Sequence, residues 1–272
     1  MEAQNEAERR EFQYQVEEAH RLREYGYSIV EGKHQGHFER KDYIAFGLFS
    51  RCLQTHEATE LLVRQSLIDD AWVLIRSLVE HTVNAIYMLR IADATVANDF
   101  NDYQYYLAYK VLLDLKATDE PMLRRLVSQE KEEKGRVQYE RVRARFDDKR
   151  GDKWSVDDAL YKRASKLDEA TSIELGERRR DLLWLVNSLW RYASSYTHGT
   201  ALALSDQFEE KAEEVWIKRK PTFAEAAKAM QSANSALYFV LLPIDLRLGG
   251  RNSAELNRRF GAWVAGKTTS PE

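Results

Sequence analysis

The sequence contains little cysteine, proline or glycine. Among its 272 residues are one cysteine, four prolines and 12 glycines. The single cysteine, Cys52, excludes a disulfide within the chain and a zinc site built from cysteines. The scarcity of helix-breaking residues, in a chain that is 44% hydrophobic, argues against a loop-rich fold and favours long helices around a sizeable core.

The sequence also lacks a long apolar run and an excess of one charge. Its longest apolar stretch, ALYFVLLPI at 236–244, is too short to cross a bilayer, and the N-terminus is charged from its second residue, unlike a secretory signal. With 41 basic and 44 acidic residues, the chain has no general attraction for nucleic acid or an anionic membrane. These features predict a cytoplasmic protein that does not associate with membranes.

Apolar residues recur at helical spacing along most of the chain, and no segment alternates as strands do. Helices are predicted at 5–25, 43–67, 69–92, 94–116, 121–150, 155–170, 174–198 and 222–248. The segment 26–42 reads as a loop, 208–221 as a loop or short helix, and the last helix as broken near Pro243. The predicted fold is all-α, a single domain over 1–272 with about eight to nine helices, in which the polar stretch 117–170 forms a helical arm or insertion.

The arm has a local excess of positive charge, with ten Lys or Arg against six Asp or Glu in 124–150. Four arginines are candidates for contact with RNA phosphates: Arg136, Arg141, Arg143 and Arg145. A solvated helix laced with Glu–Arg pairs explains the same charges. The arm is preceded by three tyrosines, Tyr103, Tyr105 and Tyr106. They could stack on RNA bases, or they could pack within the protein, as aromatic residues at helical spacing usually do.

Several familiar kinds of site are missing from the sequence. It has no glycine-rich phosphate loop before a helix and no Gly-x-Ser-x-Gly elbow. His34 and His37 stand in a His-x-x-His pattern, but no acidic or cysteine partner lies at ligand spacing, which favours a solvated loop over a metal site. The sequence therefore indicates no metal and no cofactor.

One polar group interrupts the apolar pattern of the helix at 69–92. Arg76 and Glu80 are four residues apart and can pair on one face. Such a pair is costly to bury unless something uses it, but it can also serve simply to link two helices. His81 lies about 140° round the helix from Arg76, so the three side chains cannot all face one site.

A second polar group, SLWRYASSYTHGT at 188–200, closes the helix predicted at 174–198. Arg191 and His198 are seven residues apart and share a face, with Ser194 and Ser195 between them. Arginine offers a fork of donors that suits a phosphate, and histidine can move a proton near neutral pH. Together they could cleave RNA without a metal. Alternatively, His198 and Gly199 are simply residues that suit a helix C-terminus.

The stretch RYASSYTH resembles the Arg, four to six residues, His signature of the HEPN superfamily of all-helical domains, many of which are metal-independent endoribonucleases in toxin–antitoxin and antiphage systems. The resemblance implies Arg191 and His198 as the catalytic pair, with Arg76 and Glu80 contributed by an earlier helix. It also implies a homodimer whose signature helices line a shared cleft. The signature is short, and RSLVEH at 76–81 satisfies it as well.

The leading functional hypothesis is therefore an endoribonuclease of a toxin or antiphage defence system, with RNA, a second copy and an antitoxin or defence protein as partners. The alternative is a non-catalytic helical module that binds a protein or small ligand between Arg76, Glu80, Tyr196 and His198. A weaker third possibility is modification of Tyr192 or Tyr196 by a partner enzyme.

Overall fold

The structure is a computed structural model of the whole chain. It describes residues 2–32, 34, 36–117, 128–146, 159–176, 178, 180–200, 203, 208–211, 214–217, 221–250, 254–256 and 258. Its helices and strands are α1 (Glu2–Glu31), α2 (Arg40–Arg64), α3 (Ile68–Arg90), α4 (Ala94–Ala117), α6 (Gln129–Val142), η1 (Arg143–Arg145), α7 (Leu160–Leu175), α8 (Asp181–Trp184), η2 (Leu185–Trp190), α9 (Arg191–Thr197), β1 (Phe208–Lys211), β2 (Glu214–Ile217) and α11 (Phe223–Arg247).

The all-α prediction is confirmed, since the described residues include nine α-helical segments. None of the described helices combines the length and the hydrophobicity needed to cross a membrane. One prediction was wrong, because 208–217 contains two short strands, β1 and β2, which pair as an antiparallel hairpin with Phe208 opposite Ile217. With only four residues in each strand, the segment was too short to show a convincing alternation of apolar and polar residues.

Several helix boundaries also differ from the sequence prediction. The first helix continues through Gly26 to Glu31 instead of ending before a loop. A Cβ at Gly26 would lie only 2.4 Å from the side chain of Leu53 on α2. This glycine therefore allows two helices to approach closely. At the other end of the chain α11 runs through Pro243 without a break, held by its burial against neighbouring helices.

The polar region after α4 is not one helix from 121 to 150. Ser128 is extended and its hydroxyl accepts a hydrogen bond from the backbone N–H of Lys131, so it caps the start of α6. The helix ends at Val142, and the single turn η1 follows it to Arg145. Likewise, Gly176 ends α7 in a left-handed conformation, and the next helix starts only at Asp181. Pro121 and the predicted start at 155 lie outside the described residues.

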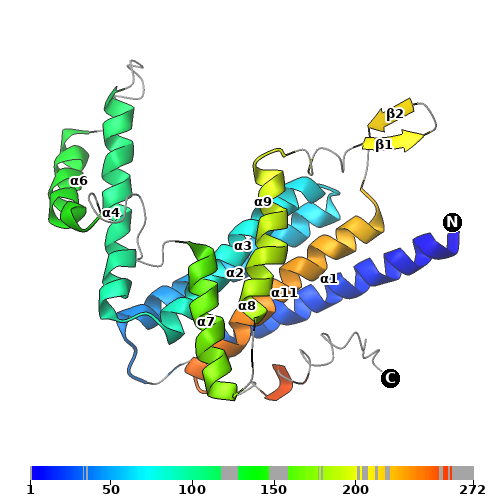
Figure 1. Cartoon of the computed structure of the whole chain (residues 1–272), viewed down its shortest axis with the longest axis horizontal. Coiled ribbons are helices and arrows are strands. Elements are labelled where there is room, and N and C mark those ends of the chain that lie inside the picture. Colours follow the sequence, from blue (N-terminus) through cyan, green and yellow to red (C-terminus); the bar gives the residue numbers. More distant parts are fainter. Residues whose placement is uncertain are drawn as a thin grey trace.

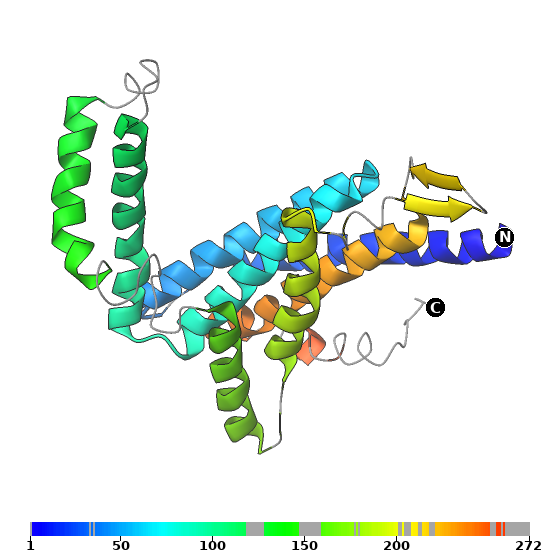
Figure 2. The same ribbon diagram turned by 45° about the horizontal axis from the view of Figure 1, so that its top comes forward.

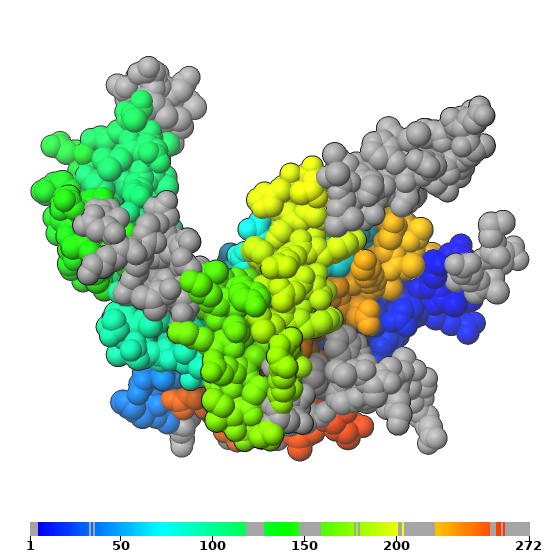
Figure 3. All heavy atoms as spheres, viewed as in Figure 1, coloured from blue at the N-terminus to red at the C-terminus, as the bar shows by residue number. Residues whose placement is uncertain are grey.

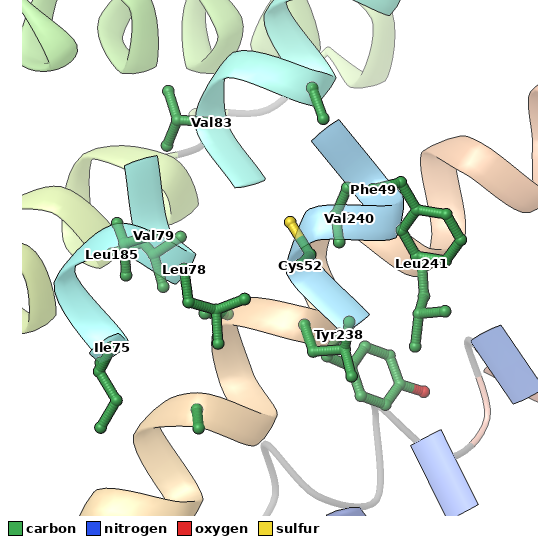
Figure 4. Close-up of a cluster of buried hydrophobic side chains, with 14 of the residues drawn as sticks. Phe49, Cys52, Ile75, Leu78, Val79, Val83, Leu185, Tyr238, Val240 and Leu241 are labelled. Atoms are coloured by element: carbon green, nitrogen blue, oxygen red, sulfur yellow. The ribbon is translucent and has the colours of Figure 1, made fainter. Parts of the chain in front are cut away.

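The long α3 lies at the centre of the bundle and packs against α2, α11, α7, η2 and α9 (Figure 1). Ile75, Leu78 and Val79 are fully buried in the same hydrophobic core as Phe49 from α2 and Leu241 from α11. In Figure 4, Val79 lies beside Leu185, and Phe49 lies beside Leu241. Cys52 belongs to this core, where burial raises the pKa of its thiol to about 12. Such a thiol is a packing group and not a nucleophile.

The part of the molecule that projects from the bundle is an α-hairpin of α4 and α6, which lie side by side (Figures 1 and 2). A small core of its own, built on Tyr106, Val142 and Phe146, holds the two helices together. By contrast, α7 packs against α3 in the bundle. The projecting arm thus begins and ends earlier in the chain than the predicted insertion at 117–170.

A buried polar network joins α1, α2 and α11 inside the bundle. The Arg23 guanidinium donates to Nδ1 of the fully buried His56 at 3.1 Å and forms an ion pair with Glu60. Because Nδ1 of His56 accepts that bond, its Nε2 carries the proton and donates to Oδ1 of Asn234 at 2.9 Å. Asn234 in turn donates to the backbone of Gln15. The network fixes the relative positions of the three helices because each buried polar group has a partner.

Burial, and then the nearby charge of Arg23, lowers the pKa of His56 from 6.5 to about 4. The unfolded chain therefore takes up a proton on this imidazole at a higher pH than the folded protein does. We expect the free energy of unfolding to fall by on the order of 3 kcal/mol as the pH drops from 6.5 to 4. Chemical denaturation at a series of pH values would measure this, and His56→Gln, which cannot be protonated, should flatten the dependence in that range.

The exposed His37 provides the control, since His37→Gln should leave the pH dependence unchanged. Equal pH dependence in the wild type and in His56→Gln would contradict the assignment of a buried neutral imidazole.

Candidate functional site

The helix that carries Arg191 and His198 has an unusual start. Residues Leu185–Trp190 form the π-helix η2, which continues directly into α9. A π-helical segment rotates the residues that follow it relative to a regular α-helix and often adjoins a functional site. At the other end, Gly199 is left-handed, and the backbone N–H groups of Gly199 and Thr200 bond to the carbonyls of Tyr196 and Ser195. This Schellman motif fixes His198 as the residue that ends α9.

Aromatic packing determines which side of α9 faces the protein. The buried Trp72 of α3 meets Tyr192 edge to face at 4.7 Å between ring centroids and stacks on Tyr196 at 5.9 Å. The hydroxyls of the two tyrosines lie 2.9 Å apart. Because Tyr192 and Tyr196 are one turn apart, both rings hold the same face of α9 against α3.

Arg191 and His198 are both exposed on α9, which lies at the surface in the space-filling view (Figure 3). Their directions round the helix differ by only about 20°, whereas Tyr192 points about 100° away from Arg191. Within the described part of the chain, neither side chain forms a hydrogen bond or an ion pair. The guanidinium and the imidazole are thus accessible, on one side of one helix, and make no polar contact with the described residues.

The two serines between them are engaged within their own helix. The hydroxyl of Ser194 donates to the carbonyl oxygen of Trp190 at 2.7 Å, and that of Ser195 donates to the carbonyl oxygen of Tyr192 at 2.6 Å. Ser195 is also buried. Neither hydroxyl proton points toward a substrate in this structure, and Tyr196 is half-buried against Trp72. These three residues therefore shape and support α9.

Arg76 and Glu80 do pair, with 3.5 Å between Nε and Oε1, and both side chains are half-exposed. The indole N–H of Trp190 donates to Glu80 at 2.8 Å, and the Arg76 guanidinium lies 5.3 Å from the centre of the Trp190 ring. The pair therefore joins α3 to η2, immediately before Arg191. Among the described residues, no hydrogen bond or ion pair connects it directly with Arg191 or His198.

The second match to the signature, RSLVEH, has a different environment. His81 is half-buried, and its Nδ1 is inaccessible to solvent. Burial, and then the positive charge of Arg51 on α2, lowers the pKa of this imidazole. Arg76, meanwhile, is held against Trp190. Of the two matches, only Arg191 and His198 present both side chains to solvent.

Each of the four arm arginines has an acidic partner. Arg136 bonds to Glu133 at 2.7 Å, and Arg143 lies 3.5 Å from Glu140. Arg141 and Arg145 both bond to Asp102 on α4, and Arg145 also bonds to the buried Asp99 at 2.9 Å. The last two arginines therefore tie α6 and η1 to α4, which is a structural role.

The tyrosines of the arm also have structural contacts, because they pack against one another. Tyr106 is almost fully buried, and the rings of Tyr103 and Tyr139 stack on it at 5.9 and 5.6 Å. Tyr105 packs against the same cluster. These contacts occupy the aromatic faces that base stacking would need.

No group of three or more His, Cys, Asp or Glu side chains among the described residues could hold a metal ion. Nε2 of His34 lies 2.5 Å from the carbonyl oxygen of Ile29, so the imidazole forms a hydrogen bond with the last turn of α1. The chemistry available to the described residues near α9 is therefore that of the side chains themselves: proton transfer by an imidazole and charge stabilisation by a guanidinium.

A family model described as a family of unknown function (DUF5677) matches residues 42–215. The chain belongs to this family. The matched region starts in α2 and ends in β2, so the DUF5677 segment contains the arm and both Arg–His pairs, while all of α1 and all of α11 lie outside it. Comparisons with curated proteins and with solved structures gave no match.

Three residues of this region were not singled out as part of the site from the sequence: Trp72, Trp190 and Lys228. Trp72 sets the orientation of α9, Trp190 binds Glu80, and the ammonium of Lys228 on α11 lies 4.3 Å from the centre of the Tyr192 ring. Their roles depend on contacts between distant segments and on the register shift of a π-helix, for which a single sequence gives no signal.

Trp190→Phe should test the link between α3 and η2. The substitution keeps an aromatic ring beside Arg76 but removes the donor to the half-buried Glu80, so we expect the free energy of unfolding to fall by about 1 kcal/mol. Trp184→Phe is the matched control, because Trp184 is exposed in the adjoining α8. Denaturant titration should show a change below about 0.5 kcal/mol for the control. Equal effects would show that the Trp190–Glu80 bond contributes nothing.

Proposed function

We propose that this protein is a metal-independent endoribonuclease in which Arg191 binds the scissile phosphate and His198 transfers a proton. The observation that carries the proposal is the exposure of both side chains on one side of α9, with no ion pair or hydrogen bond to another described residue. The resemblance of RYASSYTH to the HEPN signature supports the same assignment. The family match leaves the reaction open, since the family itself has no known function.

The geometry suits one phosphodiester held between the two side chains. Seven residues of α-helix separate their backbones by about 10 Å along the axis. Side chains on a helix lean toward its N-terminus, so His198 leans back over the turn that separates it from Arg191. A long arginine and an imidazole can together span this distance, and the packing of Tyr192 and Tyr196 on Trp72 keeps the helix from turning.

In the proposed reaction the imidazole of His198 takes the proton of a ribose 2′-hydroxyl. The 2′-oxygen then bonds to the neighbouring phosphorus, and the bond from phosphorus to the 5′-oxygen breaks, which leaves a cyclic phosphate and a 5′-hydroxyl. The guanidinium of Arg191 stabilises the charge that develops on the phosphate oxygens. The leaving oxygen takes its proton from an acid, and in a homodimer with a shared cleft the imidazole of the second copy could supply it.

The cellular setting, a toxin or antiphage effector with an antitoxin or other protein partner, is carried by the HEPN resemblance alone. The alternative function, a non-catalytic binding module, would use the same exposed residues. The two differ in a simple observable, because a module binds its ligand without breaking it.

Arg191→Ala and His198→Ala should each lower the cleavage rate of single-stranded RNA by at least about 100-fold, because each removes one component of the acid–base and electrostatic catalysis. Cleavage by the wild type should continue in excess EDTA, and replacing the ribose by deoxyribose should abolish it. Both residues are exposed, so the thermal midpoint should change little. Gel analysis of a labelled oligonucleotide, together with a thermal melt, measures both effects.

Two surface variants serve as controls, Arg136→Ala on the arm and His37→Gln near the start of α2. Each removes an exposed residue of the same type and should leave cleavage within about twofold of the wild type. Absence of cleavage by the wild type between pH 5 and 9 would contradict the enzyme and favour the binding module.

A further inference from the structure

A lysine far away in sequence lies beside the candidate catalytic helix. Lys228 is one turn into α11, and its ammonium is 4.3 Å from the centre of the Tyr192 ring, the residue directly after Arg191. The contact places a third basic side chain beside Tyr192, which points about 100° round α9 from Arg191. The side chain is exposed, so its charge is accessible to a ligand.

Ion pairs are common among the other basic residues of this chain. Arg64, Arg145 and Arg247, for example, bond to Glu60, Asp99 and Asp42. Lys228 differs, because no described carboxylate pairs with it. Glu225 lies three residues earlier on α11, a spacing at which side chains on a helix can pair. Its carboxylate instead accepts hydrogen bonds from the backbone N–H and the hydroxyl of Thr222, at 2.7 and 3.1 Å.

Three side chains on or beside this part of α9 are exposed, are basic or titratable, and have no described acidic partner: Arg191, His198 and Lys228. Positively charged side chains attract a polyanion and not a cationic ligand. The ring of Tyr192 packs on Trp72 and attracts the ammonium of Lys228, which reduces the ordering that the ammonium needs when an anion binds.

We propose that Lys228 binds a phosphate of the RNA strand adjacent to the one held by Arg191, so that the strand passes from α9 to the Lys228 side chain on α11. This inference rests on the proposed function and adds a substrate-binding residue from α11 to it. Lys228 touches the strand away from the bond that breaks. Its loss therefore weakens binding and leaves the chemical step intact.

The test is RNA binding and cleavage by Lys228→Ala and Lys228→Arg. We expect Lys228→Ala to raise KM about tenfold with kcat within twofold, and Lys228→Arg to restore most of the loss, because a single charge-assisted contact has about this effect. Binding is measured in the His198→Ala background, where the RNA stays intact. There, Lys228→Ala should lower the slope of log affinity against log salt by about 0.7, the value for one phosphate contact to a single strand.

Lys110→Ala is the matched control, since Lys110 on α4 makes a similar contact with the ring of Tyr106 at 4.7 Å. The inference would be overturned if Lys228→Ala left KM and the salt slope unchanged, or if Lys110→Ala changed them equally. In either case, cleavage by the wild type would still support the proposed function. Conversely, a wild type that binds RNA through Lys228 without cleaving it would support the inference and refute the nuclease. A wild type that neither binds nor cleaves RNA would refute both.

Discussion

The contact between Trp72 and the two tyrosines of α9 is the constraint on which the candidate site depends. A short surface helix could rotate about its axis, and each rotation would present different residues to solvent. Because Tyr192 and Tyr196 lie one turn apart and both rings meet the buried indole, only one orientation is compatible with the core. That orientation turns Arg191 and His198 outward. The functional proposal is thus a consequence of core packing.

The bundle that holds Trp72 is fixed by two kinds of interaction. Apolar side chains from α2, α3 and α11 fill its centre, and the network of Arg23, His56, Glu60 and Asn234 fixes the helices relative to one another. Directional hydrogen bonds select one register among the many that apolar packing alone would accept. The residues of this network are buried, paired and structural. Arg191, His198 and Lys228, by contrast, are exposed and have no acidic partner among the described residues.

The helical pattern of the sequence predicted the fold class and the existence of the long helices, because burial of one face repeats every turn. It misplaced features that depend on contacts between helices. Gly26 looked like a loop residue, although it permits close packing against Leu53, and the strands of the hairpin at 208–217 were too short to recognise. The spacing of Arg191 and His198 predicted a shared face from helix geometry alone, and the structure shows that both side chains are exposed. Their relation to Trp72 and Lys228 could not be predicted, because it arises from chain segments more than 30 residues away.

The central claim is that Arg191 and His198 act together on a single phosphodiester. Single-turnover cleavage of one RNA oligonucleotide by the wild type, the two single alanine variants and the double variant tests it most directly. Residues that act as a unit are strongly non-additive, so the double variant should be no more than a few-fold slower than the slower single variant. Losses that multiply in the double variant would show that the two side chains act independently, and single variants that cleave as fast as the wild type would place the chemistry elsewhere.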